Sequence, residues 1–175
     1  MTVADGRTAT LRRLRPSDAQ ALLAAIDEAD PADLRRRFMG STPPATFLLK
    51  RLADIDAQHH VGLGAFDGQR LVGVAQFDRG DDRPTAEVAI EIASDWQHTR
   101  LGTQMLLHLS DMARECGITR FTACFFADNL GIQHLIRDID GRVRIHYEAG
   151  EGFAEIHLDR APEPTLTRAS GVTGQ

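Results

Sequence analysis

The sequence predicts a single α/β domain, and three observations support this fold class. Residues 85–93 alternate large apolar side chains with acids and alanine, as a strand does, and from Gly102 the apolar residues recur with helical spacing. Next, the Asp67-Gly68 pair between two apolar runs is typical of a β-hairpin turn. Finally, 175 residues that are 42% hydrophobic are enough for one core, with no repeat or long linker to suggest a second.

The chain is predicted to begin with a strand at residues 8–15 and a helix after it. Ser17 is expected to cap this helix, with Gln20 completing a capping box, because this spacing satisfies two free backbone N–H groups. The expected buried stripe of the helix is Leu22, Ala25, Ile26 and Ala29.

Two more helices are predicted before the hairpin. One begins at Asp30-Pro31, because aspartate is favoured at the cap and proline in the first turn. Its three consecutive arginines, 35–37, are expected to form a solvated face with local ion pairs, and the alternative is a dock for an acidic partner. The next helix spans about residues 43–53, and its large apolar residues include Phe47, Leu48 and Leu52.

The hairpin strands are predicted at residues 60–66 and 70–78, and a polar segment then leads into the strand at 85–93. After a break at Ser94-Asp95, the long helix starts near Gly102. Its apolar stripe is Met105, Leu109, Met112 and Cys116, and Gly117 is expected to stop it. The free N–H groups and partial positive charge of such a helix start suit a phosphate, although an ordinary strand–helix connection is the alternative.

The last third is predicted to hold three strands and one helix. They follow in the order strand 120–126, helix 129–139, strand 142–147 and strand 153–158. We expect one domain over residues 1–160 and a mobile tail at 161–175, because the tail has few large apolar side chains.

Residues 96–103 (WQHTRLGT) resemble the loop that binds the pyrophosphate of acyl-CoA in the GNAT acetyltransferase superfamily. That loop has the pattern Gln/Arg-x-x-Gly-x-Gly/Ala, which Gln97 and Gly102 match. Arg100 stands where the family usually has glycine. The guanidinium either adds a charge-assisted contact to the pyrophosphate or weakens the site, because a side chain replaces open space.

The resemblance extends over about residues 8–159, since the predicted elements follow the superfamily's order. Residues 30–38, 52–65 and 86–97 are also similar to the catalytic domain of bacterial protein-lysine acetyltransferases. The resemblance implies a mixed, mostly antiparallel sheet of six or seven strands, splayed where the cofactor enters, with helices on both faces.

The implied activity is transfer of an acetyl group from acetyl-CoA to a primary amine. A protein lysine is the favoured acceptor, and a small amine or an antibiotic is the alternative. An alternative of another class is a non-catalytic acyl-CoA-binding regulatory module. It is suggested by Arg100 and by the absence of a tyrosine that many relatives carry in the helix after residue 129.

The resemblance places the general base at Glu87, ten residues before Gln97. An alkylammonium has a pKa of about 10.4, so a base that removes its proton is useful. Glu91 is a second candidate, because residues four apart on a strand share a face. The alternative is that both are solvent-facing acids on the wet side of a sheet.

The resemblance also implies the cofactor-binding residues. The cofactor arm is expected along the backbone of Ile90, Glu91 and Ile92, in the manner of an added strand. Asn129 is expected to touch the arm, to cap the helix that follows, or to do both. The pyrophosphate loop comprises Gln97, His98, Thr99, Arg100, Leu101, Gly102 and Thr103.

The residues offer no clear proton donor for the leaving thiolate. Tyr147 is expected to be a packing residue. A thiolate of pKa about 8.5 needs little help, and water is an alternative donor. Cys124 is not expected to carry an acyl group, because no activating base lies near it in sequence.

Composition bears on partners and location. A net charge of −5 gives no general footprint for nucleic acid, and no apolar run reaches the ~20 residues needed to cross a membrane. We therefore expect a cytoplasmic protein with Cys116 and Cys124 as buried free thiols, although a disulfide is not excluded by the sequence. The seven histidines lack metal-site spacing, so no metal is expected.

Exposed edge strands make a homodimer possible.

Overall fold

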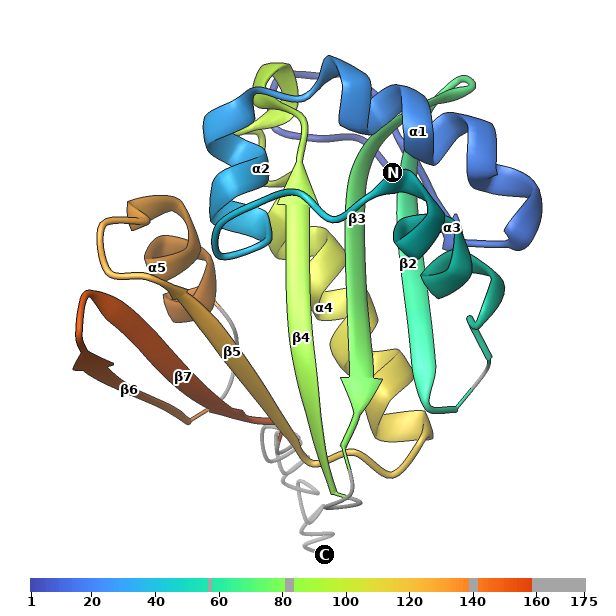
Figure 1. Ribbon diagram of the computed structural model, residues 1–175. Coiled ribbons are helices and arrows are strands. Elements are labelled where there is room, and N and C mark those ends of the chain that lie inside the picture. Colours follow the sequence, from blue (N-terminus) through green and yellow to red (C-terminus); the bar gives the residue numbers. More distant parts are fainter. Residues whose placement is uncertain (57, 81–83, 139–141, 159–175) are drawn as a thin grey trace, which may run out of the picture.

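The computed structural model describes residues 1–56, 58–80, 84–138 and 142–158 (Figure 1). Its sheet has seven strands in the order β1-β2-β3-β4-β5-β7-β6. The strands are β1 (Thr10–Arg13), β2 (His60–Asp67), β3 (Arg70–Arg79), β4 (Thr85–Ile92), β5 (Arg120–Phe126), β6 (Val143–Glu148) and β7 (Glu151–His157). The helices are α1 (Ala19–Glu28), α2 (Pro31–Arg37), α3 (Ala45–Ala53), α4 (Leu101–Glu115) and α5 (Leu130–Arg137).

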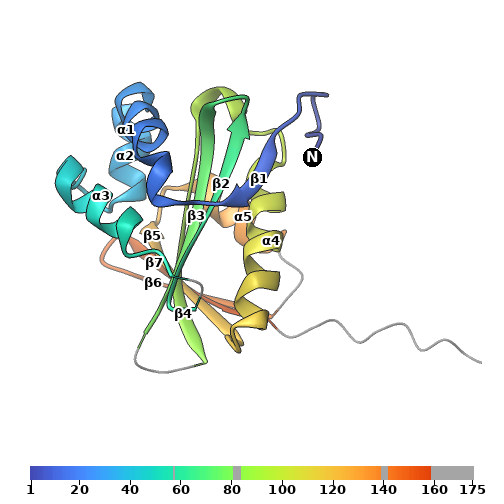
Figure 2. The same cartoon turned by 90° about the vertical axis from the view of Figure 1, so that its right-hand side faces the viewer.

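Neighbouring strands pair antiparallel throughout this sheet except for β4 and β5, which run parallel. Helices α1, α2 and α3 cover one face of the sheet, and α4 and α5 cover the other (Figures 1 and 2). The predicted mixed, mostly antiparallel sheet with helices on both faces is therefore confirmed. Along the described part of the chain, no helix has the length and hydrophobicity needed to span a membrane.

The side chains of β4 alternate between the two faces of the sheet, and this alternation places its apolar residues in the core. Val88 is buried, and Ile90 and Ile92 pack with it toward α4, whereas Glu87 and Glu91 lie on the opposite face. The larger cluster lies between the sheet and α4, and its bulky members include Phe77, Trp96, Met105, Leu109 and Phe121. A smaller cluster beneath α1 and α3 consists of Leu14, Leu52, Phe66 and Leu71.

The predicted capping box at Ser17 is wrong. A 3-10 turn, η1 (Pro16–Asp18), intervenes, and α1 begins only after Asp18. The Asp18 carboxylate accepts a hydrogen bond from the Arg15 N–H at 2.8 Å and pairs with the Arg12 guanidinium of β1 at 2.7 Å. An ion pair with a neighbouring strand determines the start of this helix, and local spacing does not reveal such a contact.

The predicted stripe of α1 is only partly buried. No residue of α1 is fully buried, and Leu22 and Ala25 pack at the margin of the smaller cluster. The predicted turns are confirmed: Gly68 joins β2 to β3 with φ of 58°, and Gly117 follows α4 with φ of 77°. The described part of the predicted 1–160 domain ends at residue 158, and the predicted tail at 161–175 lies outside the described residues.

Candidate active site

The sheet opens between β4 and β5. These strands pair only from Thr85 to Glu87 on β4 and then diverge, as Figure 1 shows. On its other edge β4 stays paired with β3, and the Ala93 N–H continues this ladder to the Val72 C=O at 3.0 Å. Because backbone groups alternate in direction along an antiparallel strand, the N–H groups of Ile90 and Ile92 point to the open edge. The N–H groups of Ile90 and Ile92 on this edge can pair with an added extended chain, whereas the Ile92 C=O accepts from the Gln97 Nε2 at 3.2 Å.

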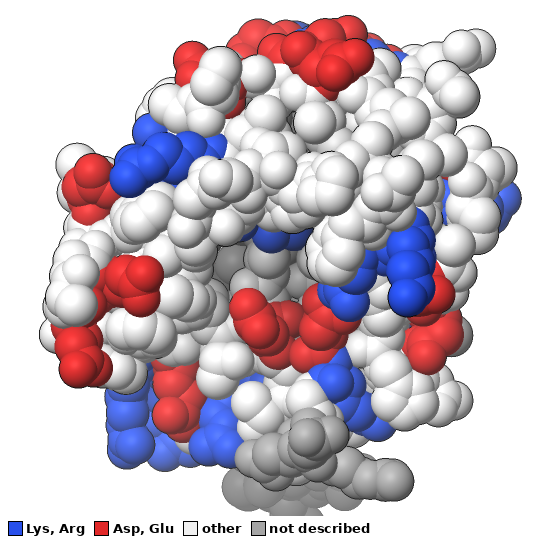
Figure 3. All heavy atoms as spheres, in the orientation of Figure 1, with Lys and Arg blue, Asp and Glu red and all other residues white. Residues whose placement is uncertain are grey.

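A cleft of about 850 Å³ occupies the opening. Its wall includes Val88 and Ile90 from the α4 side of β4, and also Glu87 and Glu91 from the α2 side. The cleft therefore passes through the sheet from one face to the other. Figure 3 shows the α2 face hollowed near its middle, with acidic side chains along the edge of the hollow.

The α4 side of the cleft ends at the start of α4. The first helical hydrogen bond runs from the Gln104 N–H to the Arg100 C=O at 3.1 Å, so the helix itself does not use the N–H groups of Gly102 and Thr103. The loop before the helix places two non-glycine residues in the left-handed region, His98 with φ of 60° and Arg100 with φ of 68°. The family usually has glycine at the position of Arg100, and this backbone conformation is a reason for it besides the space that a ligand needs. Only glycine adopts the left-handed conformation without strain.

Gly102 leaves room for a ligand at this helix start. A Cβ added there would meet the Leu135 Cδ1 at 3.5 Å and the Ile92 Cγ1 at 3.6 Å, which are ordinary van der Waals distances. The protein's own packing therefore does not require glycine at this position. A helix N-terminus whose N–H groups the helix does not use, with glycine at its second residue, fits the phosphate of a coenzyme.

Of the residues predicted to hold the cofactor, Thr99 does not line the cleft. Its side chain is buried: Oγ1 donates to the Trp96 C=O at 2.7 Å and accepts from the Leu101 N–H at 3.4 Å. Thr99 thus stabilises the loop from inside. The cleft wall includes the other predicted residues, Ile90, Glu91, Ile92, Gln97, His98, Arg100, Leu101, Gly102, Thr103 and Asn129.

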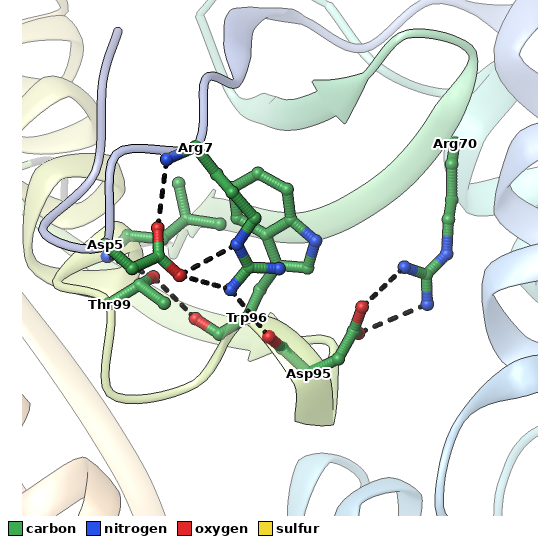
Figure 4. A network of polar contacts seen from close by, with 7 residues as sticks. Asp5, Arg7, Arg70, Asp95, Trp96 and Thr99 are labelled. Carbon is green, nitrogen blue, oxygen red and sulfur yellow. Dashed lines mark hydrogen bonds and ion pairs between the residues drawn. The ribbon is translucent and has the colours of Figure 1, made fainter.

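The segment before β1 braces this loop from outside (Figure 4). The Ala4 N–H donates to the Thr99 C=O at 3.0 Å, and the Arg7 Nη2 donates to the Asp95 C=O at 2.8 Å. The Arg7 guanidinium also lies over the Trp96 ring. The Asp95 carboxylate in turn pairs with Arg70 of β3 at 2.8 Å. Sequence reasoning missed this brace, because its partners are far apart in the chain.

Glu87 lies where β4 and β5 part. It is exposed and lines the cleft, and it is the register partner of Asp78 on β3 and of Thr122 on β5. Asp78 is paired with the Arg51 guanidinium of α3 and has buried His60 as its own partner on β2. A row of polar residues thus crosses the sheet at the branch point.

Glu91 lines the cleft closer to α2 and is partly buried. Burial raises the pKa of its carboxyl to about 7, an effect that Arg37 opposes and that Asp33 reinforces. The two candidate acids therefore share one face of β4 in different surroundings, because α2 covers Glu91 and leaves Glu87 open to solvent.

The arginines of α2 do not behave as one solvated face. Arg35 lies over the Phe126 ring at 4.7 Å, Arg36 pairs with Asp33, and Arg37 lines the cleft. Burial lowers the pKa of the Arg37 guanidinium and Glu91 opposes the effect, but an arginine stays charged at neutral pH. Arg36 lines the cleft as well but is exposed, so the expected solvated face is corrected at Arg37. The reason is that α2 lies across the opening of the sheet and places its last arginine in the cleft wall, partly buried.

Cys124 is exposed and lines the cleft, so the prediction of a buried thiol there is wrong. Partial desolvation of its Sγ and the negative charges of the nearby Glu151 and Glu87 raise the pKa of this thiol, which keeps it protonated at neutral pH. Cys116 is half-buried, and neither cysteine forms a disulfide. Ala123, Cys124 and Phe125 of β5 line the cleft, because β5 pairs with β4 only as far as Thr122.

Asn129 caps α5, because its Oδ1 accepts from the Ile132 N–H at 3.2 Å, and it also lines the cleft. Both expectations for Asn129 are therefore compatible with its position. Leu135 lines the cleft from α5. Tyr147 lies outside the cleft wall, 52% exposed and edge-on to the Phe125 ring at 6.5 Å.

Comparisons with known proteins agree with this geometry. Residues 23–139 match the model of the acetyltransferase (GNAT) family. The chain is 32% identical over 136 residues to an acetyltransferase of Pseudomonas aeruginosa, covering 75% of this chain and 73% of that protein. It is 28% identical over 163 residues to the acetyltransferase Pat of Mycolicibacterium smegmatis, covering 89% of this chain but 49% of that protein, so it spans about half of Pat.

The fold resembles a solved structure as well. The GNAT domain of S. lividans PAT superimposes with a TM-score of 0.82 at 23% identity, covering 90% of this chain and 94% of that one.

Proposed function

Because the chain belongs to the GNAT family of acetyltransferases, we propose that its acceptor is a protein lysine and that Glu87 is the general base. As a member of this family it is an N-acetyltransferase with acetyl-CoA as co-substrate. The observation that carries the proposal is the cleft through the sheet. It has a free helix N-terminus on one side of the sheet, and Glu87 lines it on the other, where the strands part.

The coenzyme is proposed to enter from the α4 side. Its diphosphate would bind the free N–H groups at the start of α4, with Gly102 leaving the space for it. Its arm would pair with the open edge of β4 at Ile90 and Ile92, which directs the thioester toward the α2 face.

The amine would arrive from the α2 face. Glu87 removes a proton from the ammonium, directly or through one water, and the neutral nitrogen attacks the thioester carbonyl. A C–N bond forms, the C–S bond breaks, and the thiolate leaves with its electron pair. The attacking nitrogen then gives its second proton to water, which leaves a neutral amide, and Glu87 returns its own proton to solvent before the next turnover. The thiolate, of pKa about 8.5, takes its proton from solvent water, and no covalent enzyme intermediate is required.

Charge supports a cationic acceptor. Glu87 and Glu91 line the cleft without an ion-pair partner within hydrogen-bonding distance among the described residues. The Glu87 carboxylate favours the approach of an ammonium, and Glu91, with a pKa of about 7, adds negative charge on the same face of β4 when it is ionised. The similarity of residues 30–38, 52–65 and 86–97 to protein-lysine acetyltransferases supports a lysine side chain.

A small amine is the second candidate, and Arg37 is the observation that favours it. Its guanidinium lines the cleft without a hydrogen-bond partner among the described residues. A guanidinium there suits the carboxylate of a small amino-acid-like acceptor.

We also propose a cytoplasmic location, which fits two cysteines that are not joined in a disulfide, and a homodimer formed through an edge strand, since β1 and β6 are the outer strands of the described sheet. Cell fractionation tests the location, and light scattering of the purified chain tests the dimer.

The test of the proposal is Glu87→Gln. Release of free thiol from acetyl-CoA is measured over a panel of lysine peptides, polyamines and amino acids, and calorimetry measures acetyl-CoA affinity. We expect turnover on the best acceptor to fall by on the order of a hundredfold with unchanged coenzyme affinity, because a missing base slows only the chemical step. Glu115→Gln, an exposed change on α4, is the control.

Each other result has a definite meaning. Normal turnover in Glu87→Gln removes Glu87 from the role of base. Turnover of small amines without turnover of peptides favours the small-amine acceptor. Coenzyme binding without turnover of any amine favours a regulatory acyl-CoA-binding module.

A further inference from the structure

Asp33 on α2 joins helix α2 to the start of the cofactor loop. Its side chain is 11% exposed, and its carboxylate receives three donors. The Ser94 Oγ donates at 2.8 Å, the Gln97 Nε2 donates at 3.1 Å, and Arg36 pairs with it from the next turn of the same helix. A carboxylate so enclosed loses stabilising partners if either side moves.

The contact reaches the open edge of β4 through Gln97. The same Nε2 that donates to Asp33 also donates to the Ile92 C=O at 3.2 Å. The Gln97 side chain is thus held by α2 and by the last residue of β4. Any ligand that orders the loop at Gln97, or that pairs with β4 beside Ile92, acts on a group bonded to Asp33.

The other end of α2 lies on the acceptor side. Helix α2 has seven residues, none of them fully buried, so few contacts determine its position. Its last residue, Arg37, lines the cleft near Glu91. A change in the position of α2 therefore moves charge at the place where an amine would enter.

We propose that Asp33 is a positioning residue that couples occupancy of the cofactor loop to the order of α2. The inference rests on the proposed placement of the coenzyme at the start of α4. Coenzyme binding immobilises Gln97, Gln97 and Ser94 hold Asp33, and α2 then presents Arg37 to the cleft in one orientation. The acceptor side is ordered by the coenzyme before the amine arrives.

A purely structural role for Asp33 predicts something different. In that case, replacing Asp33 would lower the free energy of unfolding but would not change how coenzyme binding affects α2. The two roles are separated by hydrogen exchange of the α2 amides, measured with and without saturating coenzyme A. This readout needs no acceptor and no turnover.

In the wild type, we expect coenzyme A to slow exchange in the peptide covering residues 31–37 by fivefold or more. In Asp33→Ala, coenzyme A should still slow exchange at the start of α4, while the slowing in α2 is lost. Asp33→Asn should retain it, because an amide oxygen still accepts from Ser94 and Gln97. Asp27→Ala, an exposed change on α1, is the control and should match the wild type.

Equal slowing in Asp33→Ala and wild type would overturn the proposal. So would the absence of any slowing in α2 of the wild type when coenzyme A is bound. If Asp33→Ala does not fold, Ser94→Ala removes one donor and leaves the carboxylate. We then expect partial loss of the slowing, and an unchanged value rejects the coupling. Failure of coenzyme A to bind the wild type would instead refute the proposed coenzyme site.

Discussion

The guanidinium of Arg7 lies over the indole ring of Trp96, with its Cζ 4.1 Å from the ring centroid (Figure 4). Asp5 orients this guanidinium, because its carboxylate accepts a hydrogen bond of 2.8 Å from the Arg7 Nε. Trp96 is fully buried, lines the cleft and immediately precedes the cofactor loop, so the cation packs against the start of that loop. The segment before β1 therefore holds a loop that itself contains two strained residues.

Arg7→Ala should weaken acetyl-CoA binding about fivefold, because the variant loses the cation–π contact and the hydrogen bond to the Asp95 C=O, and the ligand must then order a looser loop. Calorimetry measures the affinity, and turnover at saturating acetyl-CoA should change little. Arg13→Ala, also exposed and also near the N-terminus, is the matched control. Equal affinity in wild type and Arg7→Ala would show that the loop does not depend on this brace.

Arg100→Gly should raise the free energy of unfolding by about 1 kcal/mol, because a non-glycine residue at φ of 68° and ψ of 9° is strained. The same change should lower acetyl-CoA affinity several-fold at low salt, since it removes a cation beside the phosphate site. Urea denaturation and calorimetry at two salt concentrations measure the two effects. Tighter binding by the glycine variant would show that the side chain hinders the coenzyme.

Glu91→Gln should change how stability depends on pH. The folded protein holds the Glu91 proton up to a pKa of about 7, whereas the unfolded chain releases it near 4.5. The contribution of protonated Glu91 to the free energy of unfolding is therefore fully present below pH 4.5 and is lost as pH rises through 7. The variant lacks this decline. The difference in free energy of unfolding between the variant and wild type should therefore shift in favour of the variant from pH 5 to pH 8, by at most on the order of 3 kcal/mol.

Urea denaturation at pH 5, 6.5 and 8 measures this difference, with Glu115→Gln as an exposed control. A difference that stays constant across the three pH values would mean that Glu91 is not desolvated as its burial indicates.

His60 is 7% exposed, and its Nδ1 and Nε2 have no hydrogen-bond partner among the described residues. Burial lowers the pKa of this imidazole, although Asp78, whose Oδ1 lies 3.9 Å from Nε2, opposes the effect. The unfolded chain therefore binds the proton more readily, and stability is lost as pH falls below 6.5.

His60→Leu should remove this loss below pH 6.5. At pH 7.5 it should raise the free energy of unfolding by about 1 kcal/mol, because two buried polar atoms without partners are replaced by apolar ones. Thermal denaturation at pH 5.5 and 7.5 gives the comparison, and His108→Gln on the exposed side of α4 is the control. A variant that is equally destabilised at both pH values would reveal a polar partner of His60.

Sequence reasoning succeeded where one segment carries its own signal. The hairpin at Asp67-Gly68 and the change of period between β4 and α4 were predictable, because turn chemistry and side-chain spacing are local. It failed at Ser17, where an ion pair between Asp18 and Arg12 determines the helix start. It also failed at Cys124, because a period of two assigns a residue to a face but does not say whether that face is covered.

By itself, the sequence determined the order of the elements, the loop motif around Gln97 and Gly102, and the two acids on one face of β4. The tertiary structure alone decided which distant groups meet there. Asp33 reaches Gln97 across 64 positions of the chain, and Arg7 reaches Asp95 across 88. Local spacing fixes the direction of a side chain relative to its own strand or helix, whereas its partners depend on strand register and helix packing, which arise only when the whole core forms.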